Sequence, residues 1–146
     1  MISGIDRKKS LQELENSDWG DPESGETSMI ARCLRLRRTP LEQLSTDDLR
    51  LMIGQKISPP YLVPLCLDRM ELDPLLEATY FRGDLLKALL QLDEKFWKGH
   101  RDSLSAVREL IAQAKEAAAN NDEDARSVVE AVPAFLCEPD NTNGSV

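Results

Sequence analysis

The stretch SPPYLVPLCLDRMELD, residues 58–73, is apolar on nearly every side until Asp68. A helix with apolar residues all round is typically buried, so we expect it at the centre of the fold. Pro59 or Pro60 can open this helix, because the first helical position needs no N–H group. Pro64 is expected to lie still within the first turn. The stretch therefore predicts a central helix against which the rest of the chain packs.

Two further segments carry helical patterns. Residues 83–92 have leucines at i, i+1, i+4 and i+5, namely Leu85, Leu86, Leu89 and Leu90. Such spacing places them on one helical face. Upstream, Ser45 is a good N-cap, and Asp47 and Asp48 follow it in the first turn, where a helix favours negative charge. The buried face of that helix is expected to consist of Leu49, Met52, Ile53 and Ile57.

Helical patterns cover much of the remaining chain. They predict a short helix with Leu11 and Leu14, one from Ser28 to before Pro40, a long one from Asp102 or Ser103, and a last one over Asp122–Val132. In the second of these, the apolar residues at helical spacing are Met29, Ile30, Cys33 and Leu34. Strict apolar and polar alternation, the signal of a half-buried strand, does not appear.

We therefore predict an all-α fold, a single compact bundle of about six or seven helices packed around residues 60–72 and 83–92. The length of 146 residues fits one domain, 1–146. Its ordered core is expected at roughly 10–136, with flexible ends at 1–9 and 138–146.

The composition agrees with helices and sets the charge. There are 22 Leu against 12 Val plus Ile, and unbranched side chains lose little rotamer freedom in a helix. The chain has 26 acidic and 18 basic residues, a formal charge of −8. A surface of that sign repels nucleic acid and anionic lipid and attracts a basic partner. We expect no nucleic-acid and no membrane partner.

The cysteines indicate a reducing compartment. Cys33, Cys66 and Cys137 are odd in number, widely spaced and without a CxxC pair, and the first two lie on apolar helical faces. The N-terminal residues MISGIDRKKS contain no apolar signal region, and no apolar run reaches the ~20 residues of a membrane span. A cytoplasmic location is expected.

Signatures of catalysis and of cofactor binding are weak. The single histidine, His100, follows Trp97 at a predicted helix end, and nothing nominates the third group that usually orients a catalytic base. Spacing excludes a metal site built from His and Cys, and no phosphate-binding glycine pattern is present. The basic block Arg32, Arg35, Arg37 and Arg38 is expected to pair with the helix dipole and with acids. We therefore predict a protein without catalytic residues, metal or cofactor, and not an enzyme.

The tripeptide Arg82-Gly83-Asp84 has the letters of a cell-adhesion signal. An adhesion ligand needs secretion and an exposed loop tip, whereas this tripeptide directly precedes the leucine face of residues 83–92. Gly83 can supply the turn or N-cap, and Asp84 places a carboxylate in the first turn. We interpret the tripeptide as a helix start.

An ordered set of segments resembles a known family. They are LQELENSDWG (11–20), the apolar stretch Met29–Cys33, PLEQLSTDDLRLMIGQKI (40–57), YLVPLCLDRMELDPLLEATYFRGDLL (61–86) and KFW (95–97). Together they resemble the immunity proteins of bacterial contact-dependent growth inhibition (CDI) systems. The resemblance covers about residues 10–97, and the DLRLMIGQ, YLVPLCL and GDLL segments are its most specific parts.

The resemblance implies the function. Such a protein stays in the cytoplasm and binds the toxic C-terminal domain that a neighbouring cell delivers, which neutralises the toxin stoichiometrically. A nuclease is the expected toxin activity. An acidic inhibitor suits a nuclease, because a nuclease that holds a polyanion tends to be basic.

Specificity for one toxin is expected on exposed charged surface, since the GDLL and YLVPL segments are interpreted as caps and core. Two acidic groups are candidates for toxin binding, namely Asp18, Trp19, Asp21, Glu23 and Glu26, and the run Asp122, Glu123 and Asp124. The alternative for the first group is a solvated loop, with Trp19 folded back onto the core. The alternative for the second is an ordinary helix N-terminus.

Two other functional hypotheses stay open. A helical adaptor or regulator without a toxin partner would share the composition and the fold. A hydrolase using surface carboxylates is the more remote possibility. An upstream gene for a large secreted exoprotein would favour immunity over both.

Overall fold

The computed structural model describes residues 4–20 and 27–137. Over these residues the chain is helical and has no strand, which confirms the all-α class. The helices are α1 (Leu11–Glu15), α2 (Ser28–Leu36), α3 (Thr46–Gly54), α4 (Pro59–Arg69), α5 (Asp84–Leu89), α6 (Glu94–Lys98), α7 (Arg101–Ala119), α8 (Glu123–Glu130) and α9 (Ala134–Cys137), with a 3₁₀ turn at Leu41–Gln43. Nine helices in the described ranges stand against the expected six or seven, because four of them span only four to six residues.

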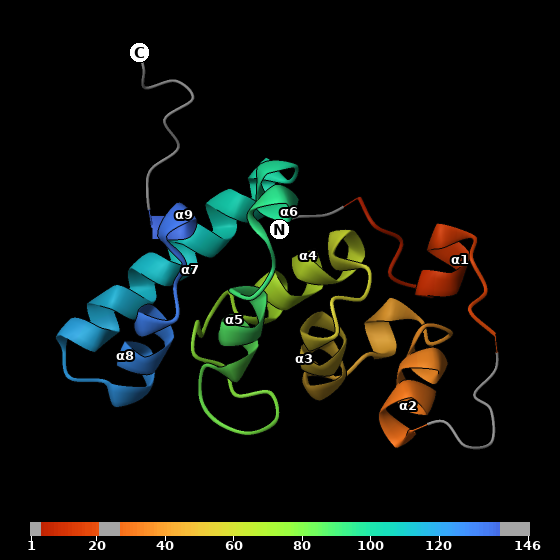
Figure 1. Ribbon diagram of the computed structural model, residues 1–146, viewed down its shortest axis with the longest axis horizontal. Coiled ribbons are helices and arrows are strands. Elements are labelled where there is room, and N and C mark those ends of the chain that lie inside the picture. The colour runs from red at the N-terminus through yellow and green to blue at the C-terminus, as the bar shows by residue number, and fades with distance from the viewer. Residues whose placement is uncertain (1–3, 21–26, 138–146) are drawn as a thin grey trace, which may run out of the picture.

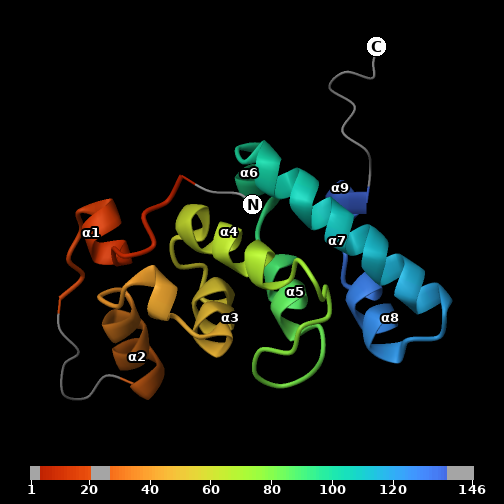
Figure 2. The same ribbon diagram turned by 180° about the vertical axis from the view of Figure 1, so that it is seen from behind.

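The helix α4 lies in the middle of the molecule, as the apolar stretch predicted. It packs against α3 on one side and against α7 on the other (Figure 1). The short helix α5 packs against α3 and α8, and α8 runs beside the long α7. Both views place α1 and α2 at the end of the molecule opposite α7 and α8 (Figure 2).

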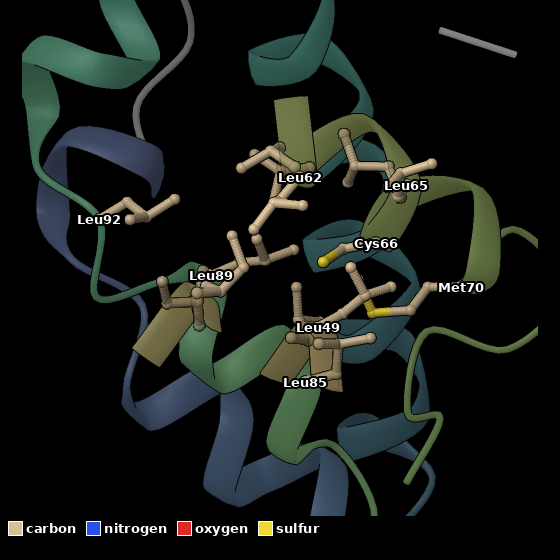
Figure 3. Packing of buried hydrophobic residues seen from close by; sticks show 14 of the residues in the cluster. Leu49, Leu62, Leu65, Cys66, Met70, Leu85, Leu89 and Leu92 are labelled. Carbon is tan, nitrogen blue, oxygen red and sulfur yellow. The ribbon is translucent and has the colours of Figure 1, made fainter. Parts of the chain in front are cut away.

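The core forms where α3, α4 and α5 meet. Leu49 from α3, Cys66 from α4, and Leu85 and Leu89 from α5 are fully buried and converge on one interior space (Figure 3). Burying one leucine side chain stabilises a fold by roughly 1.5–3 kcal/mol relative to leaving it exposed. All named members of the predicted apolar faces of α3 and α5 are buried, although Ile57 lies beyond the end of α3 and Leu90 is the C-cap of α5.

Two helices begin with reciprocal caps. The Ser45 hydroxyl accepts a hydrogen bond from the Asp48 N–H at 3.0 Å, and the Asp48 carboxylate accepts one from the Ser45 N–H at 2.9 Å. Ser10 and Glu13 make the same pair of bonds at α1. Each pair satisfies two backbone donors that a helix start leaves without a partner.

The position predicted for Pro64 is wrong. The helix α4 begins at Pro59, so Pro64 is its sixth residue and lies in the second turn. There its ring leaves the Pro60 carbonyl without the N–H that a helix would supply. Pro64 is nevertheless buried, so apolar contact offsets part of that loss.

Helix ends differ from the predicted ones in the outer parts of the fold. The helix α2 stops at Leu36, and it buries Cys33 while Met29 and Ile30 are 42% and 45% exposed. The reason is that α2 packs mainly through its C-terminal half, so its first turn extends beyond the core. The helix α8 ends at Glu130, and a separate turn, α9, follows Pro133.

The Arg82-Gly83-Asp84 tripeptide is a helix start, as interpreted. Gly83 is the N-cap of α5 with φ = 91°, a left-handed conformation that glycine adopts without steric cost. Asp84 lies in the first turn and is buried. Its carboxylate accepts hydrogen bonds from three preceding backbone N–H groups, those of Ala78, Thr79 and Tyr80, at 2.7, 2.9 and 2.7 Å.

The expectation of flexible ends is untested. Residues 1–3 and 138–146 lie outside the described residues. Within residues 4–9, the carbonyls of Arg7 and Lys9 accept hydrogen bonds from the N–H groups of Glu42 and Leu41 at 2.9 and 3.0 Å. Among the described helices, none is both long and apolar enough to cross a membrane.

Candidate functional site

Of the first predicted acidic group, the structure describes Asp18 and Trp19. Asp21, Glu23 and Glu26 lie outside the described residues. The Trp19 side chain is 52% exposed, and its ring centre lies 3.9 Å from the guanidinium carbon of Arg37. Trp19 therefore covers a buried cation with its ring and still exposes half of its surface to solvent. One face of the Trp19 ring is thus folded back against the protein, as one interpretation expected, and the rest is exposed, as a contact residue would be.

Arg37 holds this end of the molecule together. It is 1% exposed and donates hydrogen bonds to the Glu15 carboxylate at 2.5 Å, to the Ser17 carbonyl at 2.8 Å and to the Ser58 hydroxyl at 3.4 Å. The Glu15 carboxylate also accepts a hydrogen bond from the Ser58 hydroxyl at 2.8 Å, which links the two partners of Arg37. One guanidinium thus joins α1, the end of α2 and the start of α4 beneath the Trp19 ring.

Asp18, the acid of this group that lies within the described residues, is exposed. Its carboxylate accepts a hydrogen bond from the Gly20 N–H at 2.7 Å, and that bond is the main cause of a lowered pKa of Asp18. Arg38 lies at the long distance of 3.5 Å from the same carboxylate. Asp18 therefore stays a solvent-facing anion beside Trp19.

The second predicted group, Asp122 to Asp124, begins α8. Asp122 is its N-cap and accepts a hydrogen bond from the Ala125 N–H at 3.1 Å, which is the main cause of its lowered pKa. Arg82 donates to Asp124 at 2.9 Å and to Asp122 at 3.4 Å. The helix N-terminus interpretation thus holds for Asp122, and one cation already neutralises part of the charge.

Glu123 is the most exposed member of this second group. Its side chain projects into solvent and pairs with Arg126 at 3.4 Å, three residues along α8. Exposed pairs of this kind contribute little to stability, at most about 1 kcal/mol. Glu123 can therefore change partners at small cost.

The expectation for the basic block is confirmed for Arg32, Arg37 and Arg38, each of which pairs with an acid. Arg32 donates to Asp47 at 2.6 Å and to Asp48 at 2.7 Å, which ties α2 to the start of α3. These bonds contribute to a lowered pKa of Asp47, for which the hydroxyl of Thr79 is the largest cause. Arg32 in α2 and Arg37 at its C-cap are thus engaged with acids of neighbouring elements.

A surface that the sequence analysis did not predict lies between α4 and α5. We call residues 70–83 the α4–α5 loop. Its side chains Leu72, Tyr80 and Phe81 are 97%, 72% and 43% exposed. A signal was present in the sequence, because Tyr80 and Phe81 are adjacent aromatics outside any helical face. The loop extends beyond α5 at one edge of the molecule (Figures 1 and 2).

Neighbouring cations lie against both aromatic rings of this loop. The guanidinium carbon of Arg50 is 4.8 Å from the ring centre of Tyr80, and the Lys87 ammonium is 5.5 Å from that of Phe81. Such contacts orient an aromatic ring while leaving much of it exposed. Arg50 also donates to the Thr79 hydroxyl at 2.6 Å, and Thr79 in turn donates to Asp47.

A hollow of about 210 Å³ lies between α4 and α7. Leu67 and Leu110 contribute to its apolar lining, and Asp68, Glu71 and Glu109 are its acids. Asp68 is engaged by Arg7, which neutralises part of that acidic rim.

His100 follows the C-cap of α6 and has structural contacts. Its Nδ1 lies 2.8 Å from the Phe96 carbonyl, and its ring stacks on Phe96 with centres 4.3 Å apart. Within the described ranges, no group of three or more His, Cys, Asp and Glu side chains is placed to hold a metal ion.

Comparison with known proteins identifies a family. The family model described as CDI immunity proteins matches residues 13–107, about two thirds of the chain. No curated protein and no solved structure matches the chain. The matched range contains Trp19, α2 to α6 and the α4–α5 loop, and it ends within α7.

Proposed function

This chain belongs to the family of CDI immunity proteins, and on that premise we propose that it neutralises a cognate toxin by binding the toxin's C-terminal domain. The family match over residues 13–107 is the observation that carries the proposal. Inhibition is stoichiometric, because the protein acts by occupying the toxin rather than by turnover. It is not an enzyme and needs no metal or other cofactor for this role.

The toxin that suits this chain is a basic nuclease. A nuclease active site binds a polyanion, and the formal charge of −8 gives this chain a complementary potential. Opposite potentials accelerate encounter, and added salt slows it. The encounter takes place in the cytoplasm, where the toxin acts and where the three cysteines stay reduced.

The two predicted acidic groups are proposed as contact surfaces. The first contains Asp18, Trp19, Asp21, Glu23 and Glu26, and the second Asp122, Glu123 and Asp124. In support, Trp19 is an aromatic side chain half exposed beside the exposed carboxylate of Asp18. A large aromatic side chain with an acidic rim is typical of residues that dominate interface energies. A single domain, 1–146, carries both surfaces.

The proposal is tested by co-expression with the C-terminal domain of an exoprotein encoded immediately upstream of this gene. The expected result is restored growth of the producing cells and a complex that elutes as one peak in gel filtration. A toxin domain from an unrelated exoprotein is the control and should be neither neutralised nor bound. Continued killing by the cognate domain, with no complex formed, overturns the proposal.

The Trp19 surface is tested by combining Trp19→Ala with Asp21→Lys and Glu23→Lys. We expect affinity to fall by roughly 100-fold or more, as it does for interface residues that dominate binding. The matched charge control is Glu116→Lys with Glu130→Lys, two exposed acids on α7 and α8. If both variants fold and the affinity of the first is unchanged, the Trp19 segment is a solvated loop that does not contact the toxin.

A further inference from the structure

We propose that the α4–α5 loop is an apolar contact surface for the toxin domain, with Leu72, Tyr80 and Phe81 as its anchors. The inference rests on the proposed function and adds to it a surface that the two predicted acidic groups do not contain. It also commits to one occupant, a basic toxin domain. Three observations support it, and each concerns a different property of the loop.

The first observation is the concentration of exposed apolar side chains. The described residues expose six large apolar side chains, and three of these belong to the α4–α5 loop. Two of the three are aromatic, and aromatic residues are enriched at interfaces because they bury large areas with few rotatable bonds. Single exposed apolar residues are ordinary on a monomer, whereas several on one loop indicate a binding surface.

The second observation is that the backbone of the loop is fixed from inside. The buried Asp84 carboxylate accepts from the N–H groups of Ala78, Thr79 and Tyr80, directly before the exposed aromatics. The Gly83 N–H donates to the Leu75 carbonyl at 3.0 Å, which closes the base of the loop. An already ordered loop loses little conformational entropy when a partner binds.

Buried anchors fix the first half of the loop as well. Met70 and Leu75 are buried, while Leu72 between them is almost fully exposed. The Asp73 carboxylate accepts a hydrogen bond from the Leu75 N–H at 3.0 Å, which supports the turn that holds Leu72 outward. The exposure of Leu72 is thus set by a defined local structure.

The third observation is the charge of the loop. Glu71, Asp73 and Glu77 are exposed, and none of them forms an ion pair with a described residue. By contrast, the loop's own cation Arg82 is engaged by Asp122 and Asp124. The charged residues of the loop itself therefore leave an excess of negative charge, which attracts a basic partner. The two cations against its aromatic rings, Arg50 and Lys87, belong to α3 and α5.

The deciding experiment compares two double variants in binding to the cognate toxin domain. Tyr80→Ala with Phe81→Ala removes the aromatic anchors, and we expect Kd to rise by roughly 100-fold. Met29→Ala with Ile30→Ala is the matched control, because it removes an adjacent pair of similarly exposed apolar side chains on α2. We expect the control to change Kd less than threefold.

Outcomes separate this inference from the proposed function. If the unmodified protein does not bind the toxin domain, the proposed function fails. If it binds and the Tyr80/Phe81 variant binds within tenfold of it, the loop inference fails and the proposed function stands. Should that variant not fold, Leu72→Lys decides, since Leu72 is 97% exposed and supports little of the core. A tenfold or greater loss of affinity for Leu72→Lys supports the loop, and a smaller one overturns it.

The charge component has its own measurement. Glu71→Gln with Glu77→Gln removes two anions without touching the backbone bonds of the loop. Association with the toxin domain should slow about threefold at low salt and the dissociation rate should stay unchanged, as for charges at the edge of an interface. An unchanged association rate overturns the electrostatic argument for a basic partner at this loop.

Discussion

A Cβ atom on Gly83 would stand 2.7 Å from Cγ2 of Val128 in α8. Gly83 also has φ = 91°, so a larger residue there meets both backbone strain and a close contact. Strain of this kind costs about 1–3 kcal/mol, and an added core methyl group costs about the same. We therefore predict that Gly83→Ala lowers the free energy of unfolding by about 2–4 kcal/mol, measured by urea denaturation.

Gly20→Ala is the matched control for that prediction. Gly20 has the same φ of 91°, and nothing lies within 4 Å of a Cβ built on it. We expect a loss of about 1 kcal/mol from strain alone. If both substitutions lower stability equally, the approach of α8 to Gly83 contributes nothing to the result.

Arg37 is predicted to be the most sensitive cation of the fold. Arg37→Met leaves Glu15 and the Ser17 carbonyl without their buried donor. Breaking a buried ion pair from one side is strongly destabilising, and we expect a loss of about 3 kcal/mol because Glu15 retains some contact with solvent. Arg126→Ala, which breaks only an exposed pair, should change stability by less than about 1 kcal/mol.

A double-mutant cycle checks the origin of that loss. Glu15→Gln with Arg37→Met should destabilise the protein by less than the sum of the single substitutions, because the second change removes a charge already left without its partner. Additive losses in chemical denaturation would instead assign the effect of Arg37 to its contact with Trp19.

Asp84 is predicted to make stability fall in acid. Burial raises the pKa of Asp84, but the bonds from Tyr80, Ala78 and Thr79 together lower it further, so the net pKa is below the ordinary 3.8. The folded state then holds fewer protons than the unfolded state, and the contribution to stability is present above pH 3.8 and is lost below it. Urea denaturation between pH 7 and pH 3 measures this decline.

Asp84→Asn should weaken that acid dependence and release the loop. At pH 7 we expect a loss of about 2–3 kcal/mol, because an amide cannot accept all three backbone bonds. Hydrogen exchange at the amides of Thr79 and Tyr80 should accelerate more than exchange in α7. An undiminished acid dependence in the variant would place the titrating group elsewhere.

The three cysteines are predicted to react differently. Burial raises the pKa of the Cys66 thiol to about 12, and burial also raises that of Cys33, whereas Cys137 is exposed. A thiol-specific disulfide reagent at pH 8 should label one cysteine of the folded protein rapidly and all three after denaturation. Cys137→Ser should abolish the rapid phase. Rapid labelling of Cys66 would reveal opening of α4 in the native state.

Local signals explain which parts of the fold could be predicted. The Ser45 cap, the apolar face of α3 and the leucines of α5 are decided by residues within one or two turns of each other, and all are as expected. The length of α2 and the presence of the separate turn α9 depend instead on which parts of the core the other helices leave exposed. Pro64 likewise could not be placed from local signals, because burial in the core decides that α4 continues through it.

The candidate site could be predicted only in part. The sequence analysis left open whether Trp19 is exposed or folded back onto the core. Its contact with Arg37 joins residues 18 positions apart. Arg82 neutralises acids 40 and 42 residues away, which no local pattern indicates. The exposure of Tyr80 and Phe81 was not predicted, because both lie within the long family segment 61–86 and outside the apolar face of α5.

Arg82 couples two surfaces that would otherwise vary independently. It belongs to the α4–α5 loop, and its ion pairs end on the N-terminus of α8, at Asp122 and Asp124. A charge change in α8 therefore also disturbs the loop that carries Tyr80. In lineages that adapt to different toxins, positions 82, 122 and 124 should covary. Gly83 and Asp84 should stay invariant beside them, because the backbone of the fold already uses both.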